Sequence, residues 1–393
     1  MSAFEAGGMP LNIAGVEAMV YRAPVATPVQ TSFGLMHDRP SCLVCITDED
    51  GVQGWGEVWC NFPSVGAEHR ARLLIDCVAP LLLTRPWDSP AQAFDALSQQ
   101  LQILAVQSGE PGPIAQVIAG LDIAMWDLAA RRARLPLWRL LGGRSPEVAV
   151  YASGLNPSKP EVLAARRAEE GHRAFKLKVG FGEERDLANL RALRQTLGEE
   201  VSLMVDANQA WSVDEAARMS QRIADFRPLW IEEPIAADLD PVHWVALAGR
   251  STVPLAAGEN FRGDAQFDAF LASGALRVVQ PDLAKWGGFS RCIGLGQRIL
   301  ERGLWFCPHW LGGGIGLAAS LHLKAAVGGE GMVEIDANPN PLRDLFVSPL
   351  ARVSAGITTL AESPGLGIEP DLAAAAPFLV WQCATGSARP API

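Results

Sequence analysis

The spacing of apolar and polar residues changes once along the chain, near residue 145. Before that point, residues 16–59 alternate apolar and polar positions as antiparallel strands do, and Asp48-Glu-Asp-Gly51 is a strong turn signal within them. Apolar residues then recur at helical spacing in residues 68–83, 90–107 and 114–134. This first part of the chain predicts a domain of the α+β type.

From residue 148 onward, short apolar runs alternate with amphipathic helical stretches. We expect strands at residues 148–153, 174–179, 201–206, 229–232, 253–258, 276–280, 304–307 and 332–335. Strands separated in this way by helices predict a parallel β/α barrel.

The chain has 393 residues, which is more than one ordinary core, and a Pro- and Gly-containing stretch at residues 135–143 is a natural domain boundary. We therefore predict an N-terminal α+β domain over residues 1–143, a barrel over residues 144–345 and a C-terminal segment over residues 346–393. Within that segment, we expect residues 365–377 to return and cover the first domain.

Composition narrows the class of partner. Hydrophobic residues make up 49% of the chain and charged residues 19%, as in a well-packed folded protein. The net charge of −10, from 33 basic and 43 acidic residues, argues against nucleic-acid binding and against a polybasic membrane patch. We expect a small molecule as partner, and an anionic one would need locally concentrated cations.

The thiols and the N-terminus indicate a cytoplasmic protein. Seven cysteines, an odd number, are typical of reduced thiols. We interpret Cys42 and Cys45 as core residues rather than zinc ligands, because no second pair lies nearby. Residues 1–15 lack the pattern of a signal peptide, and no uninterrupted apolar run of about 20 residues predicts a membrane-spanning helix.

Two lysines stand on alternate positions of the predicted strand at residues 174–179. Lys176 and Lys178 must point to the same face of that strand. Repulsion between two ammonium groups and burial both lower a lysine pKa, which would make one of them a general base. The alternative is an edge strand with one solvated basic face.

Three acids end three consecutive predicted strands. Asp206, Glu232 and Glu259 are separated by 26 and 27 residues, close to one strand–helix unit each. Since catalytic groups of a barrel project from the carboxyl ends of its strands, the three carboxylates should converge. A hard divalent cation, best met by Mg²⁺, would relieve their repulsion. The alternative is that each acid caps the helix that follows it.

Further polar residues follow the later strands. Asp282 and His309 lie 27 residues apart, so they can pair at neighbouring strand ends, where a carboxylate orients an imidazole and raises its basicity. Lys285 is a further candidate near the site, or a solvated helix start. Glu334 is either a proton donor with a raised pKa or a salt-bridge partner.

In this order and spacing, these residues resemble the enolase superfamily and, within it, the mandelate racemase subgroup of the mandelate racemase/muconate-lactonizing enzyme family. The resemblance covers nearly the whole chain. Its motifs are Ile118-Ala-Gly-Leu-Asp-Ile-Ala-Met-Trp-Asp-Leu-Ala, Lys176-Leu-Lys178, Asp206-Ala-Asn208, Ile231-Glu-Glu-Pro234, Gly258-Glu-Asn260, Lys285-Trp-Gly-Gly288, His309, and Glu334 with residues 338–343.

The resemblance implies an N-terminal capping domain, a modified TIM-like barrel and Mg²⁺ on Asp206, Glu232 and Glu259. It also implies abstraction of the proton α to a substrate carboxylate through an enediolate. In the remaining implied roles, Lys178 is the base and Lys176 its electrostatic neighbour, His309 oriented by Asp282 is the second acid/base, and Asn208 and Glu334 assist at the carboxylate.

We expect dehydration of an acid sugar or related hydroxy acid. The alternatives are a racemase or epimerase of a 2-hydroxy acid with the same residues, a muconate-lactonizing-type enzyme with Lys285 as second base, and a catalytically silent metal-binding scaffold. Specificity should come from two loops, residues 33–38 and residues 59–66, the second with Trp59 and Asn61. A homo-oligomer is expected from the family.

Overall fold

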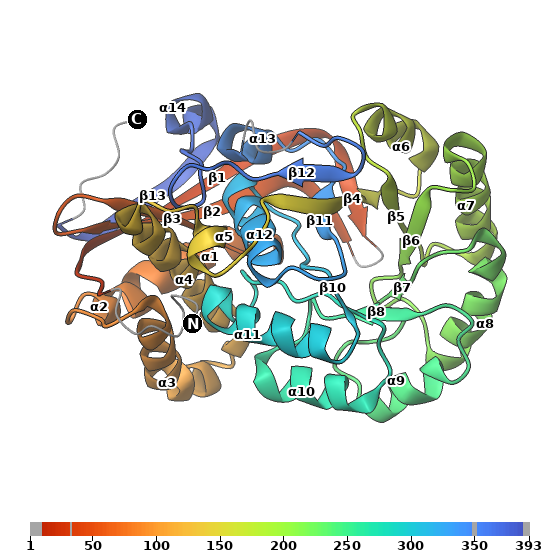
Figure 1. Cartoon of the computed structure of the whole chain (residues 1–393), viewed down its shortest axis with the longest axis horizontal. Helices are drawn as coiled ribbons and strands as arrows, with labels where there is room; N and C mark the ends of the chain where they lie inside the picture. The colour runs from red at the N-terminus through yellow and green to blue at the C-terminus, as the bar shows by residue number, and fades with distance from the viewer. Residues whose placement is uncertain (1–9, 32–33, 348–351, 388–393) are drawn as a thin grey trace.

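The computed structural model describes residues 10–31, 34–347 and 352–387. An antiparallel sheet with its helices lies on the left of Figure 1, and a curled parallel sheet ringed by helices lies on the right. The predicted fold class, a modified barrel with an N-terminal α+β cap, is confirmed.

The N-terminal domain is built from three strands in a meander and a group of helices. The strands are β1 (Ile13–Thr31), β2 (Gly34–Asp48) and β3 (Gln53–Val58). The helices are α1 (Gly66–Leu73), a π-helical turn (Leu74–Val78), α2 (Ala79–Leu82), α3 (Pro90–Ser108) and α4 (Pro111–Ala133). Helix α4 packs directly on β3, where a Cβ added to Gly56 would lie 2.1 Å from the Gly120 carbonyl oxygen.

Helix α4 is long and apolar enough to cross a membrane by length and composition alone, and it is the one such helix in the described part of the chain. However, 89% of its apolar window is buried inside the protein. Its Asp122 and Asp127 are fully buried and bind backbone N–H groups of Ser290, Trp55 and Leu366. Helix α4 is therefore the central core helix of the N-terminal domain.

A short helix, α5 (Leu137–Leu140), links this domain to the barrel. The eight parallel barrel strands are β4 (Glu147–Leu155), β5 (Ala174–Lys178), β6 (Ser202–Asp206), β7 (Ile231–Glu232), β8 (Leu255–Ala257), β9 (Val278–Val279), β10 (Trp305–Phe306) and β11 (Val333–Asp336). Each matches a predicted run. They pair in chain order from β4 to β10, with β11 on the other side of β4. Backbone hydrogen bonds from Phe306 N to Glu330 O and from Glu334 N to Pro308 O join β10 to the β11 segment.

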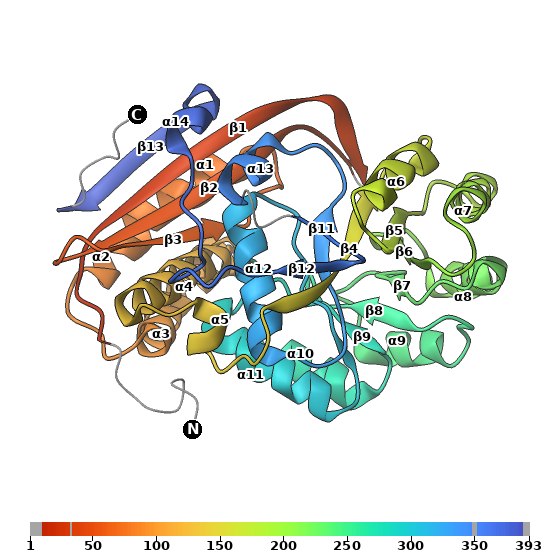
Figure 2. The same cartoon turned by 45° about the horizontal axis from the view of Figure 1, so that its top comes forward.

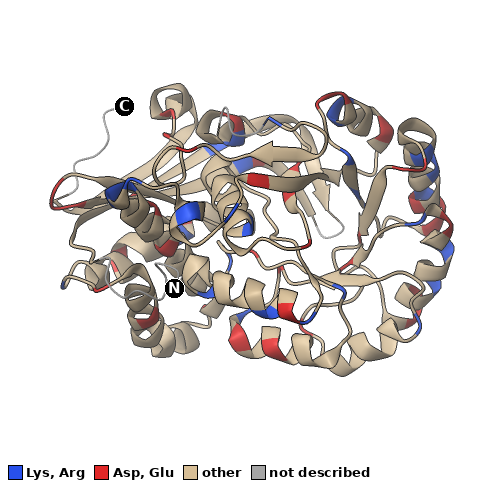
Figure 3. Ribbon diagram, in the orientation of Figure 1, with Lys and Arg blue, Asp and Glu red and all other residues tan. Residues whose placement is uncertain are grey.

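Seven helices connect these strands and form the outer ring. They are α6 (Pro160–Glu169), α7 (Glu183–Leu197), α8 (Val213–Ile223, continued by a 3-10 turn at Ala224–Phe226), α9 (Pro241–Ala248), α10 (Gly263–Ser273), α11 (Gly288–Glu301) and α12 (Gly314–Val327). Figure 3 shows basic and acidic residues interspersed along α7 and α8, as on a solvated face.

The C-terminal segment returns to the N-terminal domain. After α13 (Pro341–Val347), strand β12 (Ile357–Thr359) pairs with β4, and α14 (Leu372–Ala375) and a 3-10 turn (Ala376–Phe378) lead to β13 (Leu379–Gly386). Strand β13 pairs antiparallel with β1, and Figure 2 shows it beside that strand. Leu366 N donates to the Asp127 carboxylate, which anchors the returning segment on α4.

The expected loop at residues 33–38 is corrected by the structure. Phe33 lies outside the described residues, but Gly34–Asp38 belongs to β2, with Gly34 opposite Thr31 and Met36 opposite Val29 on β1. Pairing with the long β1 strand keeps this segment extended, so it forms the end of a β-hairpin.

The cysteine interpretation is confirmed. Cys42 and Cys45 are buried free thiols on β2, and they pack into two different hydrophobic clusters, one within the N-terminal domain and one shared with the barrel.

Candidate active site

Strand β5 lies between β4 and β6 and carries both lysines into the barrel interior. The Lys176 side chain is fully buried, and its Nζ lies 2.6 Å from Glu232 Oε2 and 3.0 Å from Glu334 Oε1. The Lys178 Nζ lies 2.5 Å from Asp206 Oδ2. The alternative of a solvated edge strand is therefore wrong.

The lysine pKa values move opposite to the expected direction. Burial by itself lowers the pKa of both lysines, but Glu232 and Glu334 raise the pKa of Lys176 well above its ordinary value. Asp206 likewise raises the pKa of Lys178 despite burial and repulsion from Lys176. Direct ion pairs outweigh burial and repulsion here.

The three acids occupy two sides of the site. Asp206 and Glu232 are register partners at the ends of β6 and β7, and both face Lys176. Glu259, just after β8, lies 2.6 Å from His309 Nε2 and 3.2 Å from Lys285 Nζ. Among the described residues, no group of three His, Cys, Asp or Glu side chains forms a ready metal cluster, because each acid contacts a cationic side chain instead.

The helix-capping alternative for these acids is wrong. Ser212 caps α8 by accepting a hydrogen bond from Glu215 N, and Asp240 caps α9 by accepting one from Val242 N. Helix α10 begins after Arg262 without a side-chain cap. Asp206, Glu232 and Glu259 therefore do not cap the helices that follow them.

The pKa values of Glu232 and Glu259 shift in opposite directions because the two side chains have different neighbours. Burial raises the pKa of Glu232 to about 7, and its Oε1 atom is buried with no hydrogen-bond partner in the described part of the chain. Burial would also raise the pKa of Glu259, but His309 and Lys285 hold it well below its ordinary value.

His309 and Asp282 pair as expected. The Nδ1 atom of His309 lies 2.7 Å from Asp282 Oδ2, and the other oxygen of Asp282 accepts hydrogen bonds from Ala284 N and Lys285 N. Because the carboxylate can only accept from Nδ1–H, Nε2 is the atom that faces Glu259. Burial lowers the pKa of His309, but Glu259 and Glu334 outweigh it and raise the pKa to about 10.

Glu334 on β11 is a salt-bridge partner in this arrangement. It pairs with Lys176 Nζ, and Tyr151 donates its hydroxyl to Glu334 Oε2 at 3.2 Å. Burial raises its pKa, but Lys176 and His309 outweigh burial and lower it. A lowered pKa favours the ionised carboxylate, so it does not support the alternative that Glu334 is a proton donor with a raised pKa.

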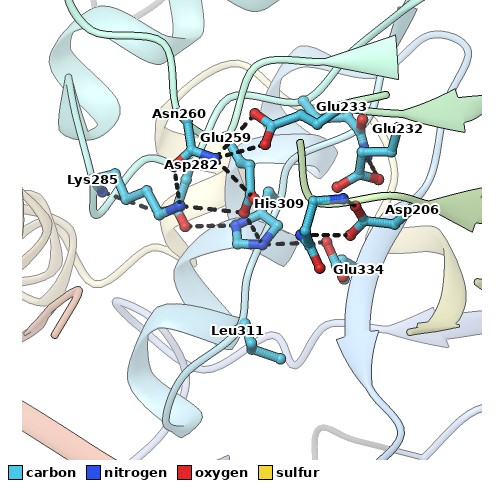
Figure 4. A network of polar contacts seen from close by, with 12 residues as sticks. Asp206, Glu232, Glu233, Glu259, Asn260, Asp282, Lys285, His309, Leu311 and Glu334 are labelled. Atoms are coloured by element: carbon cyan, nitrogen blue, oxygen red, sulfur yellow. Dashed lines mark hydrogen bonds and ion pairs between the residues drawn. The ribbon is translucent and has the colours of Figure 1, made fainter. Parts of the chain in front are cut away.

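A cavity of about 280 Å³ brings these groups together with the N-terminal domain. Lys178, His309, Lys285, Glu259, Glu334 and Asn208 line it from the barrel, and Thr31, Trp59, Asn61 and Phe62 line it from the cap. Lys176, Asp206 and Glu232 lie behind this lining. In Figure 4, His309 lies between Lys285 on its left and Asp206 on its right.

The cap residues hold the barrel side of the cavity in place. Asn61 Nδ2 donates to the Leu311 carbonyl, and the Lys285 Nζ lies 4.6 Å from the centre of the Trp59 ring. Glu57 on β3, which is buried, accepts hydrogen bonds from Gly313 N (2.8 Å) and Gly316 N (2.9 Å) at the start of α12. The cap domain therefore anchors the loop that follows His309.

Several site residues were absent from the sequence-based set. Gln280 donates to Glu232 Oε2 at 2.6 Å, and the buried Glu233 accepts hydrogen bonds from Asn260 and Gln209, both of which line the cavity. Gln280 and Glu233 stand at strand ends, so the rule that found Glu232 would also have found them. Glu57 and Leu311 carried no such signal.

The fold and the site together define a capped β/α barrel with acidic and basic side chains gathered at the strand ends. Residues 15–142 match the model of the mandelate racemase/muconate lactonizing enzyme N-terminal domain, and residues 161–375 match the enolase C-terminal domain-like model. The chain belongs to the mandelate racemase/muconate lactonizing enzyme family of the enolase superfamily, as predicted.

Two curated relatives are enzymes. The chain is 30% identical to D-galactarolactone cycloisomerase from Agrobacterium fabrum, over 91% of this chain and 96% of that protein. It is 29% identical to arabinonate dehydratase from Saccharolobus solfataricus, over 82% of this chain and 86% of that protein. The prediction of a lyase or isomerase of this superfamily is confirmed.

Solved structures of related proteins superpose on almost the whole of this chain. A mandelate racemase/muconate lactonizing enzyme from Bordetella bronchiseptica RB50 superposes with a TM-score of 0.89 at 52% identity, covering 94% of this chain and 99% of that one. A racemase from Streptomyces coelicolor A3(2) with bound magnesium gives a TM-score of 0.84 at 29% identity, covering 94% of this chain and 100% of that one.

Proposed function

We propose that this protein is a Mg²⁺-dependent enzyme that removes the proton α to the carboxylate of a hydroxy acid and then expels the β-hydroxyl as water. The observation that carries the proposal is the pair formed by Lys178 and by His309 with Asp282. These groups come from β5 and from the loop after β10, yet both line one cavity. Such a pair supplies a proton acceptor and a proton donor to one substrate.

The side chains at the strand ends have the type of donor atom that a magnesium ion requires. Asp206, Glu232 and Glu259 offer the hard oxygen donors that Mg²⁺ prefers, and Glu232 Oε1 is a buried acceptor without a partner in the described part of the chain. When bound, the ion would offset the negative charge that develops at the substrate carboxylate as the α-proton leaves. The magnesium-bound racemase structure supports this assignment.

The chain's own residues carry the proton steps. Lys178 accepts the α-proton as the neutral amine, so the C–H electron pair moves into the enediolate. A cation held by Asp206 would offset the carboxylate charge that raises the pKa of Lys178 and so favour the neutral amine. His309, with Nδ1 held by Asp282, donates a proton from Nε2 to the departing β-hydroxyl, so that the C–O bond breaks and water leaves. The resulting enol becomes a 2-keto acid on gaining a proton at carbon.

The remaining predicted residues have supporting roles in this proposal. Lys176 is fixed between Glu232 and Glu334 and adds positive charge behind the reacting carboxylate. Asn208, Lys285, Trp59 and Asn61 contact the substrate from the cavity wall.

A second candidate is racemisation or epimerisation of a 2-hydroxy acid. It is favoured by the same two-sided arrangement, because His309 can return a proton to the opposite face of the carbon from which Lys178 removed one. Lys285 could replace His309 as the second base, since its Nζ also lines the cavity.

The test is proton exchange at the α-carbon in D₂O, followed by NMR over a library of hydroxy acids with Mg²⁺ present. We expect Lys178→Ala to abolish exchange and His309→Asn to abolish product formation, while Arg191→Gln, a change at an exposed residue of α7, retains both. A product that has lost water indicates dehydration, whereas a product with all the heavy atoms of the substrate indicates racemisation or epimerisation.

Three outcomes would contradict the assignments. Near-normal activity of Lys178→Ala would remove Lys178 as the base. Loss of activity in Lys285→Ala but not in His309→Asn would transfer the second role to Lys285. Absence of exchange with every acid would indicate a silent scaffold.

Two expectations from the sequence stay predictions. The free thiols support a cytoplasmic location. The homo-oligomeric state is checked by light scattering.

A further inference from the structure

A second cavity, of about 360 Å³, adjoins the first at the domain interface. Trp59, Gln209, Glu259, Asn260 and Lys285 line both cavities. Lys285, whose Nζ contacts Glu259 and Asn260, therefore stands at the boundary between them. Beyond this boundary the lining includes Gly112, Gln116, Asp238 and Arg262.

Gln116 on α4 presents a hydrogen-bond donor to this second cavity. Arg70 Nε donates to Gln116 Oε1 at 2.9 Å, and because a guanidinium cannot accept a hydrogen bond, the oxygen must face Arg70. The amide nitrogen is thereby the free end, and it has no partner in the described part of the chain. Gln116 is only 9% exposed, and that exposure faces the cavity it lines.

A buried cation stands behind this amide. Arg70 is 5% exposed, and it forms no ion pair with any described carboxylate. Burial lowers the pKa of Arg70, and Glu110, which acts against this, is itself paired with His69 at 3.0 Å. A buried guanidinium without a paired anion is costly, and it polarises the amide of Gln116 toward an incoming negative charge.

Arg262 closes the cavity from the barrel side. A Cβ added to Gly112, in the first turn of α4, would lie 3.8 Å from Arg262 Nη1, so the guanidinium reaches the start of that helix. Arg262 forms no ion pair within the described ranges. Asp238 is the one acid on the far wall, and Glu259 is already paired with His309 and Lys285. Helix α4 has 23 residues, and its N-terminal end also favours an anion.

We propose that the second cavity binds a second carboxylate of the substrate, so that the enzyme acts on dicarboxylic hydroxy acids in preference to their monocarboxylic counterparts. This inference rests on the proposed function, which places the first carboxylate beside Lys178. The second carboxylate accepts hydrogen bonds from the Arg262 guanidinium and from Gln116 Nε2, with Lys285 at the boundary between the two ends. A monocarboxylic acid leaves these donors without an anion.

The test compares acids that differ only at the far carbon, namely gluconate with glucarate and galactonate with galactarate. Binding to the Mg²⁺-loaded protein is measured by calorimetry, and α-proton exchange by NMR. We expect at least one diacid to bind about 10- to 100-fold more tightly than its monoacid, as for hydrogen bonds to a charged group. Arg262→Gln should remove most of that preference while leaving monoacid binding unchanged.

Two further variants sharpen the result. Gln116→Glu replaces the Nε2 donor with a carboxylate oxygen that can only accept, while its other oxygen keeps the contact with Arg70, and it should weaken the diacid more than the monoacid. Arg191→Gln changes an exposed arginine on α7 and should alter neither. Arg262 is exposed, so its variant should fold normally, as circular dichroism would verify.

The outcomes distinguish this inference from the proposed function. Equal binding of every diacid and monoacid pair, or equal weakening of both by Arg262→Gln, would overturn the second-carboxylate site, and exchange with monoacids would still support the proposed function. Arg262-dependent binding of a diacid without any α-proton exchange would support the site and overturn the proposed function.

Discussion

His322 on α12 joins three parts of the chain through its two ring nitrogens. Trp138 N donates to Nδ1 at 3.0 Å, and Nε2 lies 3.1 Å from the Leu366 carbonyl oxygen. Because a backbone N–H only donates and a carbonyl only accepts, the imidazole is neutral and carries its proton on Nε2. Protonation would place a second N–H against that of Trp138, and burial lowers the pKa of His322 to about 3.

The effect on stability follows from linkage. The pKa is 6.5 for an ordinary histidine and about 3 in the folded protein. Since the unfolded chain binds the proton more readily, His322 contributes stability above pH 6.5 that is lost progressively as the pH falls toward 3. At pH 4.5 the loss is about 2.7 kcal/mol, from about 1.36 kcal/mol per pH unit over two units.

His322→Gln isolates this contribution. The glutamine oxygen can accept from Trp138 N and its amide can donate to Leu366 O, but the side chain does not titrate. Urea unfolding followed by circular dichroism at pH 7 and pH 4.5 should show that the wild type loses about 2.7 kcal/mol more than the variant. Other groups titrate equally in both proteins, among them His172, whose pKa burial lowers to about 4. Equal losses in the two proteins would refute the reasoning.

Three further predictions follow from the packing and the ion pairs. Arg39→Met should destabilise the protein by about 3–5 kcal/mol, because it leaves Asp336 buried without its ion-pair partner; an unchanged urea midpoint would contradict this. Gly56→Ala should abolish soluble expression, since its Cβ would lie 2.1 Å from the Gly120 carbonyl oxygen. Gly109→Ala, which meets nothing within 4 Å, should cost only about 1–2 kcal/mol for its left-handed backbone, and similar yields for both variants would be inconsistent with this packing. Removal of Mg²⁺ with EDTA should abolish α-proton exchange reversibly but leave the circular dichroism spectrum unchanged, because the acids are already paired with lysines and His309; exchange that persists in EDTA would exclude the metal role.

The barrel could be predicted from the sequence because each strand lies in a short run of largely apolar residues, most of which are buried. Even β9 and β10, which have only two residues each, lie within predicted runs. The acids and the Asp282–His309 pair followed from one rule about strand ends, and the two lysines followed from the alternation of side chains along one strand. The direction of the lysine pKa shifts did not, because it depends on distances of 2.5 Å to Asp206 and 2.6 Å to Glu232, which spacing along the chain cannot give.

Features created by docking of the cap on the barrel were beyond the sequence. Glu57 and Gln116 lie within an ordinary strand and an ordinary helix of the first domain, and only the domain interface brings them to α12 and to the second cavity. The hairpin end at Gly34–Asp38 contains a glycine and suggested a loop, whereas pairing with β1 decided its conformation.

Strand β13 had no counterpart among the predicted elements, and its position affects how the protein is made. Its partner β1 begins at Ile13, whereas β13 begins at Leu379, after the whole barrel. During synthesis, the N-terminal sheet must therefore wait with one edge of β1 unpaired until nearly all of the chain has left the ribosome. An unpaired edge is a template for association with other chains. The interval before β13 arrives is thus the stage of biosynthesis at which nascent chains of this protein are most exposed to aggregation and to capture by chaperones.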